Sequence, residues 1–330
     1  LVRPDTSQVN ARYLYYRLDY DYRRGETVSI QSNTTNIRNL QYGSYLNQDI
    51  PLPPFEEQRK IATVLYTVDQ AIQKTEEIID QLFRVRRGTI RELLTTGPPS
   101  KPGEKINIGP DQYYYPADWS VAPLSELINI TSGEYFPADD FCEDGIRCLK
   151  IDNVHYGRII WENETYLPED FLDEYADLVL TEGDILLAMN RPITNNKIKV
   201  GMMEKDDEPA LLYQRVGKLT PNEKIRSEYL VYALSEGPFK HQLERQLVGS
   251  DQPYINKSQL KNIKIPVPSL EEQNKIIGHI SSIDSNHKLE QESLERFKRI
   301  KQGLMQDLLS GTVRTTDTNI EVPEEIAQYG

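Results

Sequence analysis

The chain has 330 residues, of which 38% are hydrophobic, and its formal net charge is −13. This length accommodates two or three domains, and the lack of any 18-residue apolar run excludes a membrane-spanning helix. Only two cysteines and four histidines are present, which excludes a disulfide framework and disfavours a zinc site. We therefore expect a soluble, cytoplasmic protein that holds no metal ion and does not contact a membrane.

The first clear element is a long helix that begins within residues 50–61, which read IPLPPFEEQRKI. Prolines end an extended segment there, and apolar residues then recur at alternating steps of three and four, as in the seam of a coiled coil. The predicted seam contains Ile61, Leu65, Val68, Ile72, Ile79, Leu82 and Val85, with Thr75 completing the series. Gly97 and the two prolines that follow predict the end of the helix.

The next segment, residues 98–268, has an uneven charge distribution. Residues 134–184 carry 15 acidic and 3 basic residues, whereas residues 185–265 carry 9 acidic and 13 basic residues. The second half is therefore net positive although the chain is acidic, and local patches determine which ligands a surface attracts. The acidic half is interpreted as an ordinary solvated surface.

A second long helix begins within residues 265–276, IPVPSLEEQNKI, which repeat the first motif at an offset of 215 residues. Ser269 and Glu272 have capping-box spacing, and Gly311 marks the end. The predicted seam contains Ile276, Ile280, Ile283, Leu294, Phe297, Ile300, Leu304 and Leu308, with His287 at the position equivalent to Ile72. Each helix is expected to have roughly 38 residues and a length of about 57 Å. Because neither can bury its seam alone, we expect an antiparallel pair in which Ile72 and His287 face each other, with a packed helical hairpin as the alternative.

These repeated segments resemble those of the specificity subunits of type I DNA restriction-modification systems. In that family, a variable target-recognition domain ends in an Ile-Pro-Leu-Pro-Pro-x-x-Glu-Gln-like run, and a long helix follows. The helix ends RELLTTG and QDLLSG are also similar to the family. Further residues in the family's order are Trp119, Leu124, Gly133, 151–154 and 183–187.

The resemblance implies an α+β architecture in which mixed α/β target-recognition domains are separated by a long antiparallel two-helix coiled coil. The expected segments are a C-terminal remnant of a first recognition domain at 1–50, a spacer helix at 51–97, a second recognition domain at 98–268, a spacer helix at 269–311 and a flexible tail at 312–330. The implied function is sequence-specific binding of a bipartite DNA target. The implied partners are double-stranded DNA, methyltransferase subunits and a restriction subunit, and S-adenosylmethionine, ATP and magnesium would bind to those protein partners.

Polar loops in these domains supply the candidate DNA contacts. Arginine and lysine pair with guanine edges or phosphates, and asparagine pairs with adenine. In the second domain the candidates are Arg191, Asn195, Asn196 and Lys197 in one loop, and Ser250, Gln252, Tyr254, Asn256 and Lys257 in another. In the first domain they are Asn33, Thr34 and Arg38. For each loop, a solvated turn is the alternative.

No glycine-rich nucleotide motif occurs, so we expect a chain that is not itself an enzyme and has no catalytic residues. Two other functions stay open. The chain is interpreted alternatively as the C-terminal specificity module of a fused methyltransferase-nuclease, or as a truncated scaffold that binds partner subunits without DNA specificity. A methyltransferase motif upstream would favour the first, and loss of specific DNA binding by the complex would favour the second.

Overall fold

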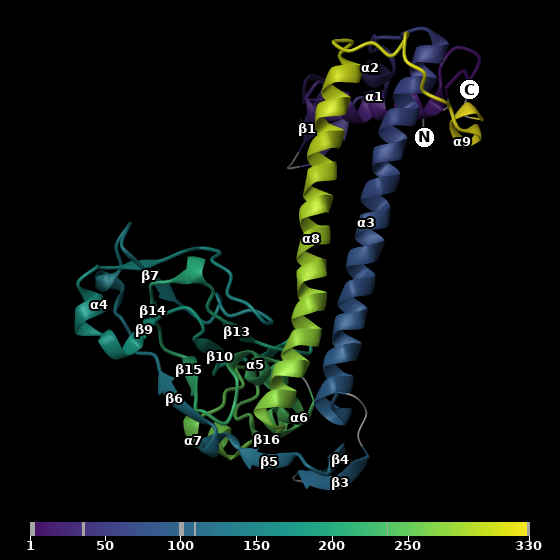
Figure 1. Ribbon diagram of the computed structural model, residues 1–330. Coiled ribbons are helices and arrows are strands. Elements are labelled where there is room, and N and C mark those ends of the chain that lie inside the picture. The colour runs from purple at the N-terminus through teal and green to yellow at the C-terminus, as the bar shows by residue number, and fades with distance from the viewer. Residues whose placement is uncertain (1–3, 35–36, 99–101, 109, 236, 329–330) are drawn as a thin grey trace. The chain divides into compact units, whose positions relative to one another are not determined.

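The computed structural model describes residues 4–34, 37–98, 102–108, 110–235 and 237–328, with the backbone alone at 32–34 and 37. The chain divides into unit 1, which comprises Leu1–Phe83 and Ser285–Gly330, and unit 2, which comprises Arg84–Asp284. Two long helices, α3 (Phe55–Thr96) and α8 (Leu270–Leu309), each run through both units (Figure 1). Within the described ranges, no helix is long and apolar enough to cross a membrane.

Helices α3 and α8 pack together in antiparallel orientation. In unit 1, Lys301 Nζ lies 2.6 Å from Asp69 Oδ1. Seventeen residues further along α3, Arg86 forms an ion pair with Asp284, which precedes Lys301 by seventeen residues in α8. Within each unit the two helices are therefore paired, and the predicted combination of mixed helix and sheet with two paired long helices is confirmed.

Apolar side chains fill the seam most completely near its two ends. In unit 1, Ile61 and Leu65 are buried with Met305 and Leu308. In unit 2, the buried seam residues are Ile90, Leu94, Ile276 and Ile280. Between these ends Thr75 is buried, and the apolar seam residues are half-buried at Val68, Ile72, Ile79, Leu82, Ile283, Leu294 and Phe297. The middle of the helix pair therefore leaves apolar surface accessible.

Three details of the predicted seam are wrong. Val85 and Ile300 are 54% and 49% exposed, because Arg86 and Lys301 occupy the seam instead, each paired with an acid of the other helix. His287 does not face Ile72. In the register set by the two ion pairs, Ile72 lies opposite Lys298. The sequence repeat makes Ile72 and His287 equivalent positions of two similar helices. Because the helices run antiparallel, equivalent positions do not face each other.

Both helices begin in the same local arrangement, each within its own unit. Gln58 Oε1 accepts a hydrogen bond from the Asn10 backbone N–H at 2.9 Å, and Gln273 Oε1 accepts one from the Arg226 N–H at 2.8 Å. Each buried amide also donates to the proline carbonyl five residues earlier, at 2.9 and 3.0 Å. A buried polar group needs such partners, so this glutamine fixes the entry of each helix.

Unit 1 surrounds the ends of α3 and α8 with short elements. These are α1 (Ala11–Arg23), the hairpin of β1 (Gln31–Thr34) and β2 (Ile37–Leu40), α2 (Tyr42–Leu46) and α9 (Glu324–Ala327). Tyr13 and Tyr16 of α1 are buried against Ile61 and Leu65. The core of this unit is therefore formed by α1 together with the two long helices.

The segment after α8, which we expected to be a flexible tail, packs against the start of α3. Arg314 Nε and Nη2 each donate to the Glu57 carboxylate at 2.6 Å. Lys60 Nζ donates to three backbone carbonyls of residues 315–318. Thr315 and Ile326 are buried. The expectation failed because these contacts join residues that are distant in sequence, and the polar composition of the segment does not reveal them.

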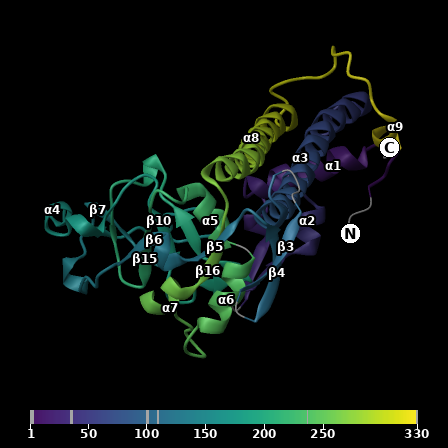
Figure 2. The same cartoon turned by 60° about the horizontal axis from the view of Figure 1, so that its bottom comes forward.

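Unit 2 contains two four-stranded sheets, ordered β13-β10-β15-β6 and β8-β7-β14-β9. Figure 2 shows β6, β10 and β15 of the first sheet side by side. The first sheet comprises β6 (Ile128–Ser132), β10 (Ile185–Ala188), β13 (Val200–Met202) and β15 (Val216–Pro221), and it is antiparallel. The second comprises β7 (Ile146–Leu149), β8 (Tyr166–Leu167), β9 (Val179–Leu180) and β14 (Ala210–Leu212), with β7 parallel to β14.

The remaining elements of unit 2 connect and cover these sheets. The strands are β3 (Gly103–Ile108), β4 (Asp111–Pro116), β5 (Ser120–Pro123), β11 (Ile193–Thr194), β12 (Lys197–Ile198) and β16 (Lys264–Val267). The helices are α4 (Phe171–Glu174), α5 (Ser227–Ser235), α6 (Pro238–Gln246) and α7 (Lys257–Asn262). One core joins the first sheet to α5, α6 and the ends of α3 and α8, and a second lies around β7, β9 and β14. The predicted recognition-domain boundaries at 98 and 268 remain a prediction.

Candidate nucleic-acid interface

The two polar loops predicted in the second domain lie side by side in unit 2. All four residues of β10 are buried, and the chain emerges from the sheet at Met189. The Arg191 N–H donates to the Pro253 carbonyl at 2.6 Å, and the Ile255 N–H donates to the Met189 carbonyl at 2.9 Å. Arg191, which follows the end of β10, therefore lies next to the loop that contains Gln252, although sixty residues of sequence separate them.

The first loop ends in a tight hairpin between β11 and β12. Asn195 and Asn196 both have positive φ, 51° and 60°, as the favoured two-residue hairpin turn requires. Asn196 Oδ1 accepts a hydrogen bond from Lys240 Nζ at 2.6 Å. Lys197 is exposed, and its Nζ lies 5.2 Å from the centroid of the Tyr156 ring. The turn conformation therefore explains both asparagines, and Asn195 is left at the exposed tip.

The second loop is closed by a pair of backbone hydrogen bonds. Val248 and Tyr254 exchange N–H to carbonyl bonds, both 2.9 Å long, and Gly249 supplies the positive φ of 91° that the turn needs. Ser250, Gln252 and Tyr254 are exposed on this loop. Their side chains are available for an external ligand.

Asn256 and Lys257 lie where this loop enters α7. Asn256 Oδ1 caps the helix by accepting the Gln259 N–H at 2.9 Å and also accepts Ser258 Oγ at 2.7 Å. Asn256 therefore has a structural role that accounts for its presence. Lys257, the first helical residue, is exposed.

The candidates in the first domain map to the hairpin of unit 1. The backbones of Asn33 and Thr34 lie in β1, and their side chains lie outside the described residues. Arg38 is exposed on β2, and its backbone pairs with that of Asn33. This hairpin and the Val248–Tyr254 loop both precede the long helix of their own unit, as the repeat predicts.

Tyr156 and Lys240 also reach this surface, and the sequence reasoning did not single them out. Tyr156 Oη lies 2.8 Å from Thr194 Oγ1 and 3.2 Å from the Thr194 carbonyl oxygen. Lys240 lies on α6 and contacts the turn through Asn196. Neither lies in the two loops that the sequence singled out. Tertiary contacts alone bring them to the loops.

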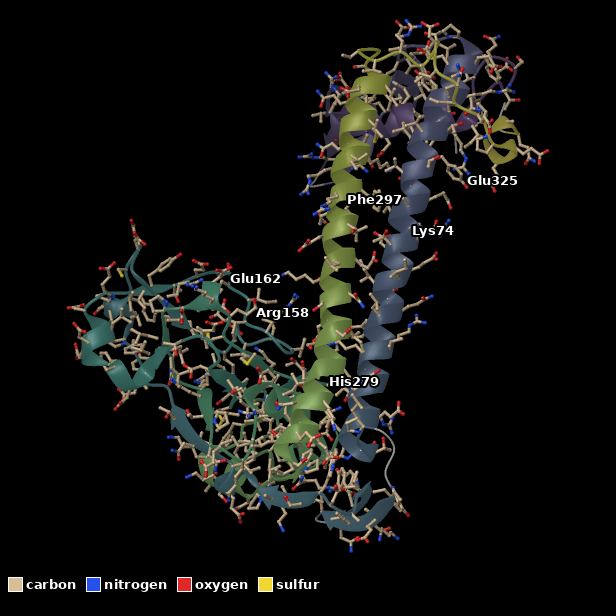
Figure 3. The ribbon with its side chains drawn as sticks, viewed as in Figure 1. Lys74, Arg158, Glu162, His279, Phe297 and Glu325 are labelled. Atoms are coloured by element: carbon tan, nitrogen blue, oxygen red, sulfur yellow. The ribbon has the colours of Figure 1, made fainter. Side chains whose placement is uncertain are left out.

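The exposed cations of the two loops are Arg191, Lys197 and Lys257, and they lie among the neutral amides of Asn195 and Gln252. Behind the surface, Lys199 Nζ donates to the Ile151 carbonyl at 2.5 Å, and burial lowers the pKa of Lys199. Arg158 and Glu162 lie on the loop between β7 and β8 (Figure 3). In the part of the chain that the structure describes, no group of three or more His, Cys, Asp or Glu side chains is placed to hold a metal ion.

Comparisons with known proteins agree with this architecture. Residues 1–84 and 116–299 match the family model for the type I restriction modification DNA specificity domain. The chain is 41% identical over 309 residues to the type I restriction enzyme MjaVIII specificity subunit of Methanocaldococcus jannaschii, covering 93% of this chain and 71% of that protein. It is 25% identical over 341 residues to the EcoBI specificity subunit of Escherichia coli, covering 96% and 69%.

A solved structure shares the fold. The S subunit of a type I restriction-modification system from M. genitalium superposes with a TM-score of 0.55 at 16% identity, covering 92% of this chain and 74% of that one. The resemblance seen in the repeated helix entries is therefore confirmed, and the chain belongs to the type I restriction-modification DNA specificity family.

Proposed function

We propose that this chain selects the DNA sequence on which a type I restriction-modification complex acts. Unit 2 binds one half of a bipartite duplex target through the loops at 189–197 and 248–257. The observation that carries the proposal is the convergence of these loops, which the Arg191 to Pro253 hydrogen bond joins at 2.6 Å. Arginine, amides and a tyrosine then share one exposed surface, as groove recognition requires.

Unit 1 supports a second recognition domain in the same subunit. On α1, Tyr15 and Tyr22 are 60% and 66% exposed. Tyr13 corresponds to Tyr229, because their hydroxyls donate to the equivalent carbonyls of Pro51 and Pro266, so the local offset is 216 residues. At the positions equivalent to Tyr15 and Tyr22 by this offset, Val231 and Pro238 are buried in unit 2, where α5 packs against β12 and β13. We propose that residues 1–50 form the C-terminal part of another recognition domain, whose sheet covers this face of α1.

The paired helices offer a surface for partner subunits. Within unit 1, Ile78, Phe83, Leu289 and Ile300 are exposed although they are apolar, and the charged side chain of Lys74 projects from α3 (Figure 3). Contiguous exposed apolar surface marks interaction sites, and we propose that these four side chains contribute to such a site. The proposed occupants are methyltransferase subunits, which would bind S-adenosylmethionine and carry out adenine methylation. A restriction subunit would use ATP and magnesium, and this chain would contribute selection without catalysis.

The proposal is tested by titrating labelled target duplex at fixed salt with this chain alone and with the chain bound to a methyltransferase subunit. We expect weak binding by the chain alone and much tighter, sequence-dependent binding by the complex, because the helices need partners to cover their apolar side chains. A non-target duplex of equal length is the control. Equal affinity with and without the methyltransferase subunit contradicts the proposed assembly.

A further inference from the structure

Arg215, which belongs to neither predicted loop, lies beside Arg191 at the end of the first sheet. It occupies the turn between β14 and β15. Its carbonyl accepts the Met189 N–H at 2.8 Å, which continues the β10–β15 ladder one residue beyond the Ala188–Val216 pair. Arg191 follows Met189 by two residues. Since a strand rises about 3.4 Å per residue, the two arginine backbones are separated by roughly 10 Å or less.

Both arginines adopt a backbone conformation that their residue type disfavours. The φ angles are 44° at Arg191 and 68° at Arg215. An L-residue with a Cβ atom rarely adopts this left-handed region, which glycine enters freely. Such strain concentrates at functional sites, where another requirement fixes the side chain.

No structural requirement for either guanidinium is visible. Both arginines are exposed, and among the described residues neither side chain has an ion pair or a hydrogen bond. The Glu134 carbonyl accepts the Gln214 N–H at 2.8 Å, and Asp251 lies in the loop that Val248 and Tyr254 close. In the part of the chain that the structure describes, neither carboxylate forms an ion pair with Arg191 or Arg215. Two unpaired guanidinium groups thus stand at the edge that already carries Tyr254.

An unpaired guanidinium matches one ligand chemistry of duplex DNA especially well. Its planar fork donates two parallel hydrogen bonds to O6 and N7 of guanine in the major groove, which is the commonest specific contact between a side chain and a base, and the same fork also fits a phosphate. We propose that Arg191 and Arg215 act as a pair of base-reading arginines, each recognising the guanine of a G·C pair in the half-site bound by unit 2. This inference rests on the proposed function and adds the chemical identity of the base.

The experiment uses the complex with its methyltransferase subunit. The target is first determined by sequencing methylated adenines, and affinity is then measured on duplexes in which 7-deazaguanine, which lacks the N7 acceptor, replaces one guanine at a time. For Arg215→Ala we expect a loss of about 10- to 100-fold on the target and a relaxed preference at one position, with unchanged affinity for non-target DNA. Arg191→Ala is expected to relax a different position.

Two further substitutions separate base reading from charge and from folding. Arg215→Lys keeps the charge without the fork, so we expect it to behave like Arg215→Ala. Arg215→Gly relieves the backbone strain, and its thermal midpoint should equal or exceed that of the wild type while specificity is lost. Arg226→Ala removes another exposed arginine of unit 2 and should leave the pattern of preferred bases unchanged.

The outcomes distinguish this inference from the proposed function. A wild-type complex without sequence preference would refute the proposed function itself. A specific wild-type complex whose Arg215→Ala variant keeps the same base preference, or loses affinity equally for all sequences, overturns the assignment of Arg215 to base reading. Insensitivity to 7-deazaguanine at every position overturns guanine as the ligand.

Discussion

At the scale of single residues, the polar loops separate into side chains that the backbone requires and side chains that it does not. Asn195 and Asn196 satisfy a turn with positive φ, and Asn256 caps α7. Lys257, the first residue of α7, has no such backbone role. Its side chain is exposed, and an exposed lysine contributes little to stability. A lysine at the edge of a DNA-binding loop most simply contacts a phosphate.

We expect Lys257→Ala to weaken DNA binding of the assembled complex without changing its sequence preference. Each lost phosphate contact should reduce the slope of log affinity against log salt by about 0.9. Titrations between roughly 50 and 200 mM salt on target and non-target duplexes measure this slope. Lys205→Ala is the matched control, because Lys205 is also exposed but has Glu204, Asp206 and Asp207 as sequence neighbours. An unchanged slope for Lys257→Ala would remove it from the interface.

At the scale of elements, periodicity predicted the long helices but not the positions where charge interrupts the seam. Hydrophobic spacing identified Ile61 and Leu65 because burial follows the helical repeat. The same spacing placed Ile300 in the seam, whereas the structure places Lys301 there. The reason is that Lys301 pairs with Asp69 on the other helix, and spacing within one helix does not reveal such a partner. The packed tail was missed for the same reason, because Arg314 finds its partner, Glu57, more than 250 residues away.

The contact between this tail and α3 should make unit 1 sensitive to acid. Glu57 is buried, and its hydrogen bonds with Arg314 lower the pKa of its carboxyl below the ordinary value of 4.5. Because the folded pKa lies below the unfolded one, the stabilisation is complete above about pH 5 and is lost as pH falls through the folded pKa. We expect Glu57→Gln to lower the thermal midpoint at pH 7 and the difference from wild type to shrink below about pH 4.

Thermal melts of wild type and variant across this pH range measure the effect. Glu56→Gln is the control, because the neighbouring Glu56 side chain is 73% exposed and forms an ion pair with Arg59 at the surface. It should change the midpoint little at any pH. A difference between Glu57→Gln and wild type that does not depend on pH would show that the contact stabilises by shape and not by charge.

At the scale of the whole chain, the repeat predicted which parts correspond but not which parts meet. The equivalence of Gln58 and Gln273 follows directly from the 215-residue offset, and the structure gives both the same contacts. By contrast, Lys240 and Arg215 reach the candidate interface through tertiary contacts and strand pairing that a single sequence does not encode locally. The helix register likewise depends on the Asp69–Lys301 and Arg86–Asp284 pairs, which join distant segments.

That register determines how the proposed spacing between half-sites is tested. Seven residues are inserted after Glu77 in α3 and seven after Glu292 in α8, which lie opposite each other in the antiparallel pair. A seven-residue insertion keeps the heptad seam and lengthens each helix by about 10.5 Å. At about 3.4 Å per base pair, the spacer between half-sites should grow by roughly three base pairs, with a tolerance of about one because the added DNA also rotates the half-sites.

Mapping methylated adenines with a specificity subunit that carries both recognition domains and these helices measures the new spacing. The bases of each half-site should stay the same, because they are read by loops such as 189–197 and not by the helices. Inserting seven residues into α8 alone is the control, and it should impair assembly because the seam of α3 then lacks its partner positions. A folded double-insertion variant that still methylates the original spacing would show that the helices do not set the distance. Altered half-site bases at constant spacing would instead place the base contacts on the helices themselves.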